Sequence, residues 1–207
     1  MATLPDTAVA LPMRERILQA AEALLRRHGP SKTSVVDVSR ALQMSHANVY
    51  RHFASKAALH DAIAERWLHR VSTPLADIAA GDGTASERLE AWVLALMEFK
   101  RRKVLDDPEM FATYHAVAIA ARDVVDTHIA TLQAQLADII HSGIVAGEFA
   151  PIDTSEAARA VLDGTARFHH PHHVRESAER DAGGEVRAAR AVVSLLVAGL
   201  RSDASAR

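Results

Sequence analysis

Apolar residues recur at intervals of three and four along most of the chain, and this spacing constrains the fold more than any other feature of the sequence. Residues 13–28 show the pattern, with Ile17, Ala21 and Leu24 on one helical face. Only nine glycines and seven prolines interrupt the 207 residues, and no segment shows the convincing alternation of a strand. The spacing predicts an all-α fold of about nine helices without an internal repeat.

Capping residues indicate where these helices begin. Ser34, Ser45 and Ser55 are suited to cap three successive helices in the first 70 residues, and the middle two helices are short. Thr84 and Glu87 have the spacing of a capping box at the start of a longer helix. We therefore expect a small four-helix part at the N-terminus, followed by a larger helical part.

The charges are distributed unevenly along the chain. Residues 13–70 hold ten Lys and Arg against five Asp and Glu, whereas residues 71–207 hold fourteen against twenty, although the net charge is only −2. The N-terminal part is therefore basic and the rest of the chain, here called the body, is acidic, which indicates that the N-terminal part binds a polyanion. The chain has no cysteine, which excludes disulfides, thiolate metal sites and cysteine nucleophiles. No apolar run approaches the roughly 20 residues of a transmembrane helix and no signal peptide is recognised, so we expect a cytoplasmic protein.

The sequence SHANVYRHFASKAAL, residues 45–59, concentrates polar and aromatic side chains on a short predicted helix. Two short helices separated by a tight turn form the helix-turn-helix layout, in which the second helix enters the major groove of DNA. Amide and guanidinium groups bind base edges, and a small side chain contacts the thymine methyl group. The residues predicted to contact bases are His46, Ala47, Asn48 and Arg51, and those predicted to contact phosphates are Thr33, Ser34, Ser45, Tyr50, His52 and Lys56.

Val49 and Phe53 are expected to point inward and to anchor this helix. The alternative interpretation is that Tyr50 and Phe53 are half-buried core residues and that the other polar side chains form an ordinary solvated face.

Several short motifs surround the predicted turn, namely Thr33-Ser34, the run 35–39, Ser45, Ala47, Tyr50-x-His52-Phe53, Ser55-Lys56 and Leu59. Through these motifs the chain resembles, over roughly residues 13–67, the DNA-binding domain of the tetracycline-repressor (TetR) family of bacterial transcriptional regulators. The turn departs from the family pattern, because Leu42-Gln43-Met44 stands where Ala-Gly-Val is usual. The glycine of that pattern takes the left-handed conformation, which costs a residue with a side chain about 1 kcal/mol.

The resemblance implies a homodimer that binds a palindromic operator in double-stranded DNA, most often as a repressor, and leaves it when a small-molecule effector binds. On this basis residues 1–12 are a disordered tail, residues 13–58 the helix-turn-helix DNA-binding domain and residues 59–207 the effector-binding and dimerisation domain. The last two helices would pair with the second subunit, although both could instead face the monomer core. The expected interface residues are Val161, Phe168, Val193, Leu196 and Leu200.

The large side chains of the body give the expected effector pocket, although the same residues would also suit a core. They are Trp67, Trp92, Leu96, Phe99, Phe111, Tyr114 and His115. His115 and His128 are candidates either for polar anchors in that pocket or for hydrogen-bonded core histidines.

Four histidines, His169, His170, His172 and His173, lie in the segment FHHPHH. Imidazole clusters bind zinc, nickel or copper, so an all-α metal-dependent enzyme or metal-binding protein using the His169–His173 cluster is the alternative function. Pro171 is expected to break the local helix, and no nearby Cys, Asp or Glu is expected to complete a ligand set, which favours a polar connector without metal. The chain has no Gly-rich phosphate loop, no G-x-S-x-G and no H-E-x-x-H. We therefore expect no enzymatic activity and no cofactor.

Overall fold

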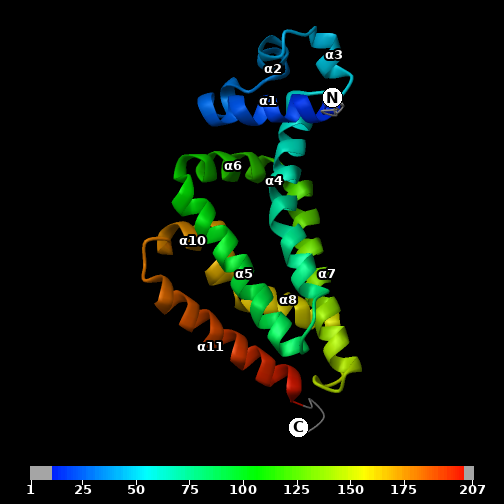
Figure 1. Cartoon of the computed structure of the whole chain (residues 1–207), viewed down its shortest axis with the longest axis vertical. Helices are drawn as coiled ribbons and strands as arrows, with labels where there is room; N and C mark the ends of the chain where they lie inside the picture. Colours follow the sequence, from blue (N-terminus) through cyan, green and yellow to red (C-terminus); the bar gives the residue numbers. More distant parts are fainter. Residues whose placement is uncertain (1–10, 203–207) are drawn as a thin grey trace, which may run out of the picture. The chain divides into compact units, whose positions relative to one another are not determined.

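The computed structural model describes residues 11–202, and in this range the chain consists of eleven α-helices and one short 3-10 helix, without a strand (Figure 1). The predicted all-α fold is therefore confirmed. The chain forms two compact units, one ending at Ala64 and one beginning at Glu65. Most of the predicted tail, residues 1–10, lies outside the described residues. No helix in the described range is both long enough and apolar enough to cross a membrane.

The first unit is a small bundle whose members share one apolar core. Side chains from each of its four α-helices are fully buried in that core, among them Ile17, Val38, Val49 and Leu59. The reciprocal hydrogen bonds of the Ser34–Asp37 capping box start the second helix, as the sequence predicts for Ser34. The elements are α1 (Met13–His28), the 3-10 turn (Pro30–Lys32), α2 (Val35–Ala41), α3 (His46–Tyr50) and the first residues of α4 (Lys56–Ala79).

The turn between α2 and α3 is tight and has the expected left-handed residue. Gln43 has a φ of 53°, and no other residue with a side chain has a positive φ in the described range. The backbone N–H of Met44 donates to the carbonyl of Ser39 at 3.0 Å, which closes the turn and brings the two helices into contact. A residue without a Cβ would adopt this conformation more readily than glutamine.

The second unit is built around a core that α4, α5, α7, α8 and α11 share. Leu89, Leu136 and Ile139 are fully buried in it. A buried polar link crosses the core, because the Trp92 indole donates to Gln135 and the Gln135 amide donates to the Ser72 carbonyl, at 2.9 and 3.0 Å. The elements after α4 are α5 (Ala85–Asp106), α6 (Pro108–Ala120), α7 (Arg122–Val145), α8 (Thr154–Gly164), α9 (Ala166–His169), α10 (Pro171–Ser177) and α11 (Ala182–Arg201).

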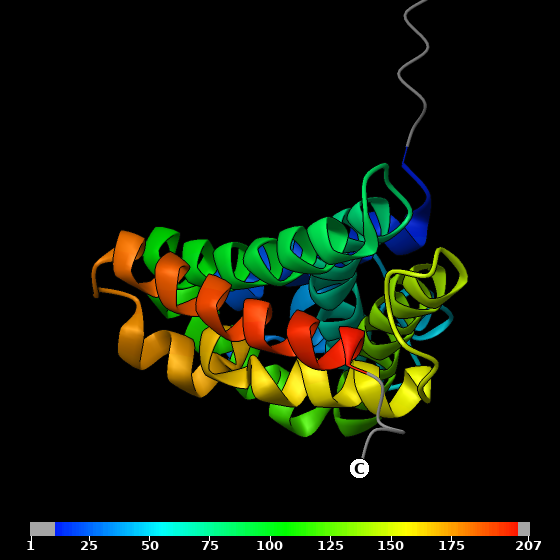
Figure 2. The ribbon, with the colours of Figure 1, turned by 90° about the horizontal axis from the view of Figure 1, so that it is seen from below.

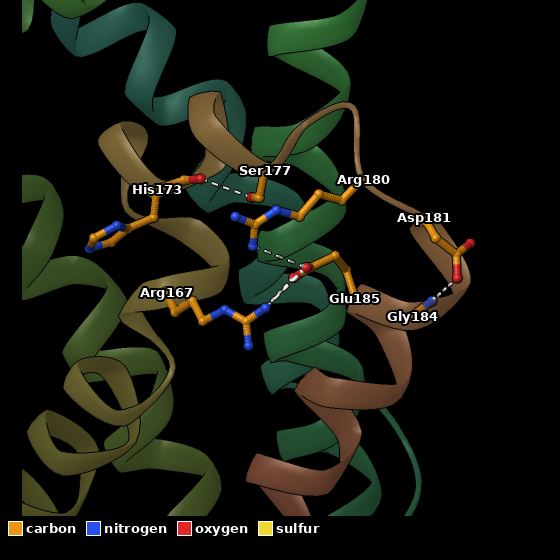
Figure 3. Close-up of polar contacts among 7 residues, drawn as sticks. All are labelled: Arg167, His173, Ser177, Arg180, Asp181, Gly184 and Glu185. Atoms are coloured by element: carbon orange, nitrogen blue, oxygen red, sulfur yellow. Dashed lines mark hydrogen bonds and ion pairs between the residues drawn. The ribbon is translucent and has the colours of Figure 1, made fainter.

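The segment around FHHPHH differs from the expectation, and it supplies the two helices beyond the nine predicted. Pro171 starts α10 instead of breaking a helix, because proline lacks only an N–H that the first helical position leaves unpaired anyway. An ion-pair network then ties this segment to α11. The carboxylate of Glu185 binds both Arg167 and Arg180, with nitrogen–oxygen distances of 3.0 and 3.9 Å (Figure 3).

The left-handed turn predicts that Gln43→Gly stabilises the first unit. Glycine removes the steric cost of the left-handed conformation but loses more entropy on folding, so the net gain should be about 0.5–1 kcal/mol. Gln43→Val should instead destabilise the unit, because a β-branched residue fits this conformation poorly. Amide hydrogen exchange in α1 and α2 of the full chain measures the free energy of opening, and a loss of protection in Gln43→Gly would contradict the analysis of this turn.

Candidate nucleic-acid interface and ligand cavity

The five-residue helix α3 is held in place by two apolar side chains. Val49 is fully buried and Phe53 is 3 % exposed, so both point inward as predicted. The guanidinium carbon of Arg14 lies 5.1 Å from the centroid of the Phe53 ring, which adds a cation–π contact from α1. Ser45 caps α3, because its hydroxyl accepts a hydrogen bond from the backbone N–H of Asn48 at 3.3 Å.

The opposite face of α3 presents side chains that can bind base edges. His46, Ala47 and Arg51 are exposed, and Asn48 is half-buried. Arg51 donates to the Asn48 side-chain oxygen at 2.5 Å, so the two side chains lie together on one face. The four residues predicted to contact bases therefore share the exposed side of the helix.

Of the six residues predicted to contact phosphates, four are exposed and two are not. Ser45, Tyr50, His52 and Lys56 are exposed, and the Tyr50 side chain is 49 % exposed, which excludes a core role for it. The Lys56 ammonium donates to the carbonyl of Ser31 at 3.2 Å and keeps two further donors.

Thr33 was predicted to contact phosphate, and this prediction is wrong for its side chain. Thr33 is fully buried, and its hydroxyl donates to the carbonyl of Gly29 at 2.9 Å. Its own carbonyl lies 2.9 Å from the His60 ring nitrogen, and burial lowers the pKa of His60, so a neutral imidazole braces α4 against this loop. The half-buried Ser34 uses both its hydroxyl and its backbone N–H in bonds to Asp37.

The second unit contains a cavity of about 320 Å³ between α4 and α7. Its volume falls in the range of small-molecule sites. Its walls combine apolar, hydroxyl, imidazole and carboxylate side chains. The lining residues are Glu65, Leu68, His69, Ser72, Asp123, Val124, Thr127, His128 and Thr131.

None of the seven residues predicted to form the effector pocket lines this cavity. Several of them fill a packed aromatic core instead, because Trp67 stacks on Tyr114 with 5.0 Å between centroids and meets Phe111 edge-on at 6.4 Å. Leu96 is fully buried, and His115 lies 6.4 Å from Phe111 in a stacked pair. Side-chain size alone therefore identified core residues.

Two buried basic residues of the second unit, the cavity residue His128 and Lys100 on α5, have shifted pKa values. Burial, and to a smaller extent the charge of Lys100, lower the pKa of His128 to about 3, and His128 Nε2 has no hydrogen-bond partner within the described chain. His128 is therefore a cavity residue with an unpaired nitrogen. Burial also lowers the pKa of Lys100 to about 8. The sequence holds a signal for Lys100, because it follows Leu96 by four positions and precedes Val104 by four, on the apolar face of α5.

The four histidines of FHHPHH divide between the interior and the surface. His169 is half-buried, its Nε2 lies 3.0 Å from the Leu162 carbonyl, and burial lowers its pKa to about 4. The ligand atoms of His172, His173 and Glu176 lie within 4.8 Å of one another on the exposed side of α10. The expectation that no acidic residue adjoins the cluster is therefore wrong, because α10 brings Glu176 one turn after His172.

Most of the predicted dimer-interface residues belong to the monomer core. Val161 and Val193 are 1 % exposed, and Leu200 is 7 % exposed, in the large core of the second unit. Phe168 is buried in a smaller cluster with Met97 and Ala189, and Leu196 is half-buried. The spacing of apolar residues identified the apolar face of each helix, but that face packs against the other helices of the second unit.

Another face of α8 and α11 is left open to solvent. Figure 2 shows these two helices side by side, and they contact each other. Leu195 is 74 % exposed on α11, one of the most exposed large apolar side chains in the described range. Exposed small residues lie on the same two helices, and none of them is among the interface residues expected from the sequence. They are Ala160 and Gly164 on α8, and Ala191, Ala198 and Gly199 on α11.

Comparisons with known proteins agree with this architecture. Two family models match the chain, one described as bacterial regulatory proteins of the tetR family, over residues 17–63, and one as the tetracyclin repressor-like C-terminal domain, over residues 85–193. A comparison with curated protein sequences finds no significant match.

Solved structures of low sequence identity share the fold. The putative transcriptional regulator from Pseudomonas aeruginosa PAO1 is 24 % identical, with a TM-score of 0.65 over 90 % of each chain. A TetR-family transcriptional regulator from Pectobacterium atrosepticum is 21 % identical, with a TM-score of 0.64 over 92 % of this chain and 94 % of that one. The regulator FadR from Bacillus subtilis, in complex with stearoyl-CoA, is 15 % identical, with a TM-score of 0.56 over 89 % and 98 %.

Proposed function

We propose that this chain, which belongs to the tetR family of bacterial regulatory proteins and is a DNA-binding transcriptional regulator, represses transcription as a homodimer and leaves a palindromic operator when a small-molecule effector binds. The observation that carries the proposal is the exposed polar face of α3, with Asn48 and Arg51 held together above the Val49 and Phe53 anchors. Because it acts on chromosomal DNA, the protein would work in the cytoplasm.

Two kinds of contact would hold the operator. Asn48 can bind adenine with both groups of its amide, and Arg51 can bind guanine with its fork of donors, so these residues would read sequence. His46 and Ala47, on the same exposed face, would complete this reading. Ser45, Tyr50, His52 and Lys56 would bind phosphate oxygens, which adds affinity but no sequence preference.

Release would follow from the geometry of a dimer on DNA. Two recognition helices must enter major grooves about 34 Å apart, one helical turn of DNA. An effector that binds only one conformation of the second unit shifts the dimer toward that conformation. A change of spacing by a few ångström would then prevent both helices from docking at once. The cavity between α4 and α7 is our candidate for the effector site, and the complex of the similar FadR with stearoyl-CoA supports a small organic molecule as the effector.

The exposed stripe around Leu195 is our candidate for the dimer interface. Small residues on α8 and α11 would let the two helices of one subunit approach those of the other, and Leu195 would fill the space between them. A two-fold axis through this face would form a four-helix interface. This assignment replaces the residues expected from sequence, because Val161, Val193 and Leu200 are already buried within one subunit.

The division between base and phosphate contacts predicts different effects for Asn48→Ala and Lys56→Ala. Asn48→Ala should lose about 1–3 kcal/mol of discrimination at one symmetric pair of base positions and keep its salt dependence. Lys56→Ala should weaken binding to all sequences and reduce the slope of log affinity against log salt by about one for each subunit. Fluorescence anisotropy with operator and base-substituted duplexes at several salt concentrations measures both quantities. Unchanged affinity in both variants would contradict the proposed interface.

The exposed stripe predicts that Leu195→Glu dissociates the dimer. Light scattering of the wild type at micromolar concentration should give about twice the 22.4 kDa chain mass, and Leu195→Glu should give a single chain. Ser194→Glu is the matched control and should stay dimeric. Ser194 is also exposed, but it lies one helical turn after Arg190, on the side of α11 where Arg190 pairs with Glu90 of α5. A dimeric Leu195→Glu would place the interface elsewhere.

A further inference from the structure

Lys100 is a buried cation without an anionic partner. Its side chain is 6 % exposed, and among residues 11–202 it is the only Lys, Arg, Asp or Glu described as buried. No hydrogen bond or ion pair reaches its ammonium group within this range. The nearest recorded contact of Nζ is the ring of Trp67, whose centroid lies 5.4 Å away. A cation–π contact offsets only part of the cost of removing an ammonium group from water.

Basic side chains from several helices surround this ammonium. The charge of Lys100 contributes to lowering the pKa of His115 on α6, His128 on α7 and His169 on α9, after burial as the main cause. Asp163 is near enough to His169 to act against this effect, but no acidic residue shifts the pKa of Lys100, whose only cause of change is burial. Because their lowered pKa values keep these imidazoles neutral near pH 7, Lys100 is the cation of this centre and lacks a counter-charge.

His128 connects this centre with the cavity between α4 and α7. It lines the cavity, and its buried Nε2 has no partner within the described residues. The acidic residues of the cavity wall, Glu65 and Asp123, are exposed to solvent, whereas the buried lining residues are Leu68, Ser72 and His128. The carboxylates of the wall therefore lie at the solvent side, whereas its buried end is uncharged and presents the unpaired nitrogen of His128.

We propose that the effector is an organic anion with an apolar body that enters this cavity, and that its carboxylate or phosphate group meets His128 at the buried end and pairs with the ammonium of Lys100, which is buried and does not itself line the cavity. The inference rests on the proposed function and names the chemical class of the ligand. An anion provides the missing counter-charge, and the hydrogen bond to a charged group is worth more in a buried site than in water. Leu68 and Val124 in the cavity wall supply apolar contacts for the ligand body.

Calorimetric titration without DNA tests the proposal with three probes, each of which contains the same phenyl ring. Benzoate and phenyl phosphate carry the two anionic groups, and benzamide is their neutral counterpart. Lys100→Met should weaken binding of the anionic probe at least about tenfold, the loss of one charge-assisted hydrogen bond, and should leave benzamide unaffected. Lys103→Met is the matched control, because it removes the same charge from an exposed position on α5.

The outcomes are distinct. Binding of benzoate alone assigns a carboxylate, and binding of phenyl phosphate alone assigns a phosphate ester. Equal affinity of wild type and Lys100→Met for the anions, or no anion binding by the wild type, overturns the proposal. If Lys100→Met does not fold, nuclear magnetic resonance of the wild-type lysine side chains decides. The pKa of Lys100, about 8 in the free protein, should rise with the bound anion, and an unchanged pKa refutes the contact.

A separate titration with operator DNA distinguishes this inference from the regulatory function. If the wild-type chain binds the anions but no operator, and Lys100→Met loses the anions, the regulatory function is refuted and the anion site is supported. Operator binding by a chain that ignores both anions would refute only the anion site.

Discussion

A helix of five residues has no independent stability in water, so the DNA-facing surface depends on the packing of α3 against the first unit. Val49 and Phe53 supply that packing, and the capping hydroxyl of Ser45 fixes the start of the helix. The left-handed Gln43 sets the turn that brings α3 beside α2. Because these inward contacts fix the helix, the outward side chains of Asn48 and Arg51 can lie together, and the Asn48 amide also donates to the sulfur of Met44 in the turn.

In the second unit the apolar packing is interrupted at one place. Most of its interior is a conventional core around Leu89, Leu136 and Ile139, but Lys100 places a charge in the interior and His128 places an unpaired nitrogen in the wall of a cavity. Unpaired polar groups destabilise a core, so their presence there is best explained by a ligand that pairs them. The same argument separates them from the exposed His172, His173 and Glu176, which water solvates without cost.

Local features of this protein were predictable from its sequence, and features that depend on packing between distant helices were not. The caps at Ser34, Ser45 and Thr84 depend on residues three positions away, so their pattern is visible in the chain itself. The burial of Thr33, by contrast, requires α1 and α4 to close over it. Four of the five residues predicted for the dimer interface are buried within one subunit, because periodicity identifies an apolar face but does not tell which neighbour covers it.

Large side chains were a poor guide to the cavity for a related reason. Trp67, Phe111 and Tyr114 fill space by stacking on one another, and the cavity forms instead beside Ser72, Thr127 and other smaller residues. The in-phase position of Lys100 on the apolar face of α5 is a sequence signal for its burial and does not reveal the cavity, which Lys100 does not line.

Selection of bound sequences from a random DNA library tests the central claim most directly. The polar face of α3, presented twice by a two-fold symmetric dimer, predicts enrichment of a palindrome whose half-sites lie about one helical turn apart. Arg51→Ala and Asn48→Ala should each change the enriched bases at symmetric positions of that palindrome. A wild-type chain that is folded and dimeric but enriches no sequence would contradict the account.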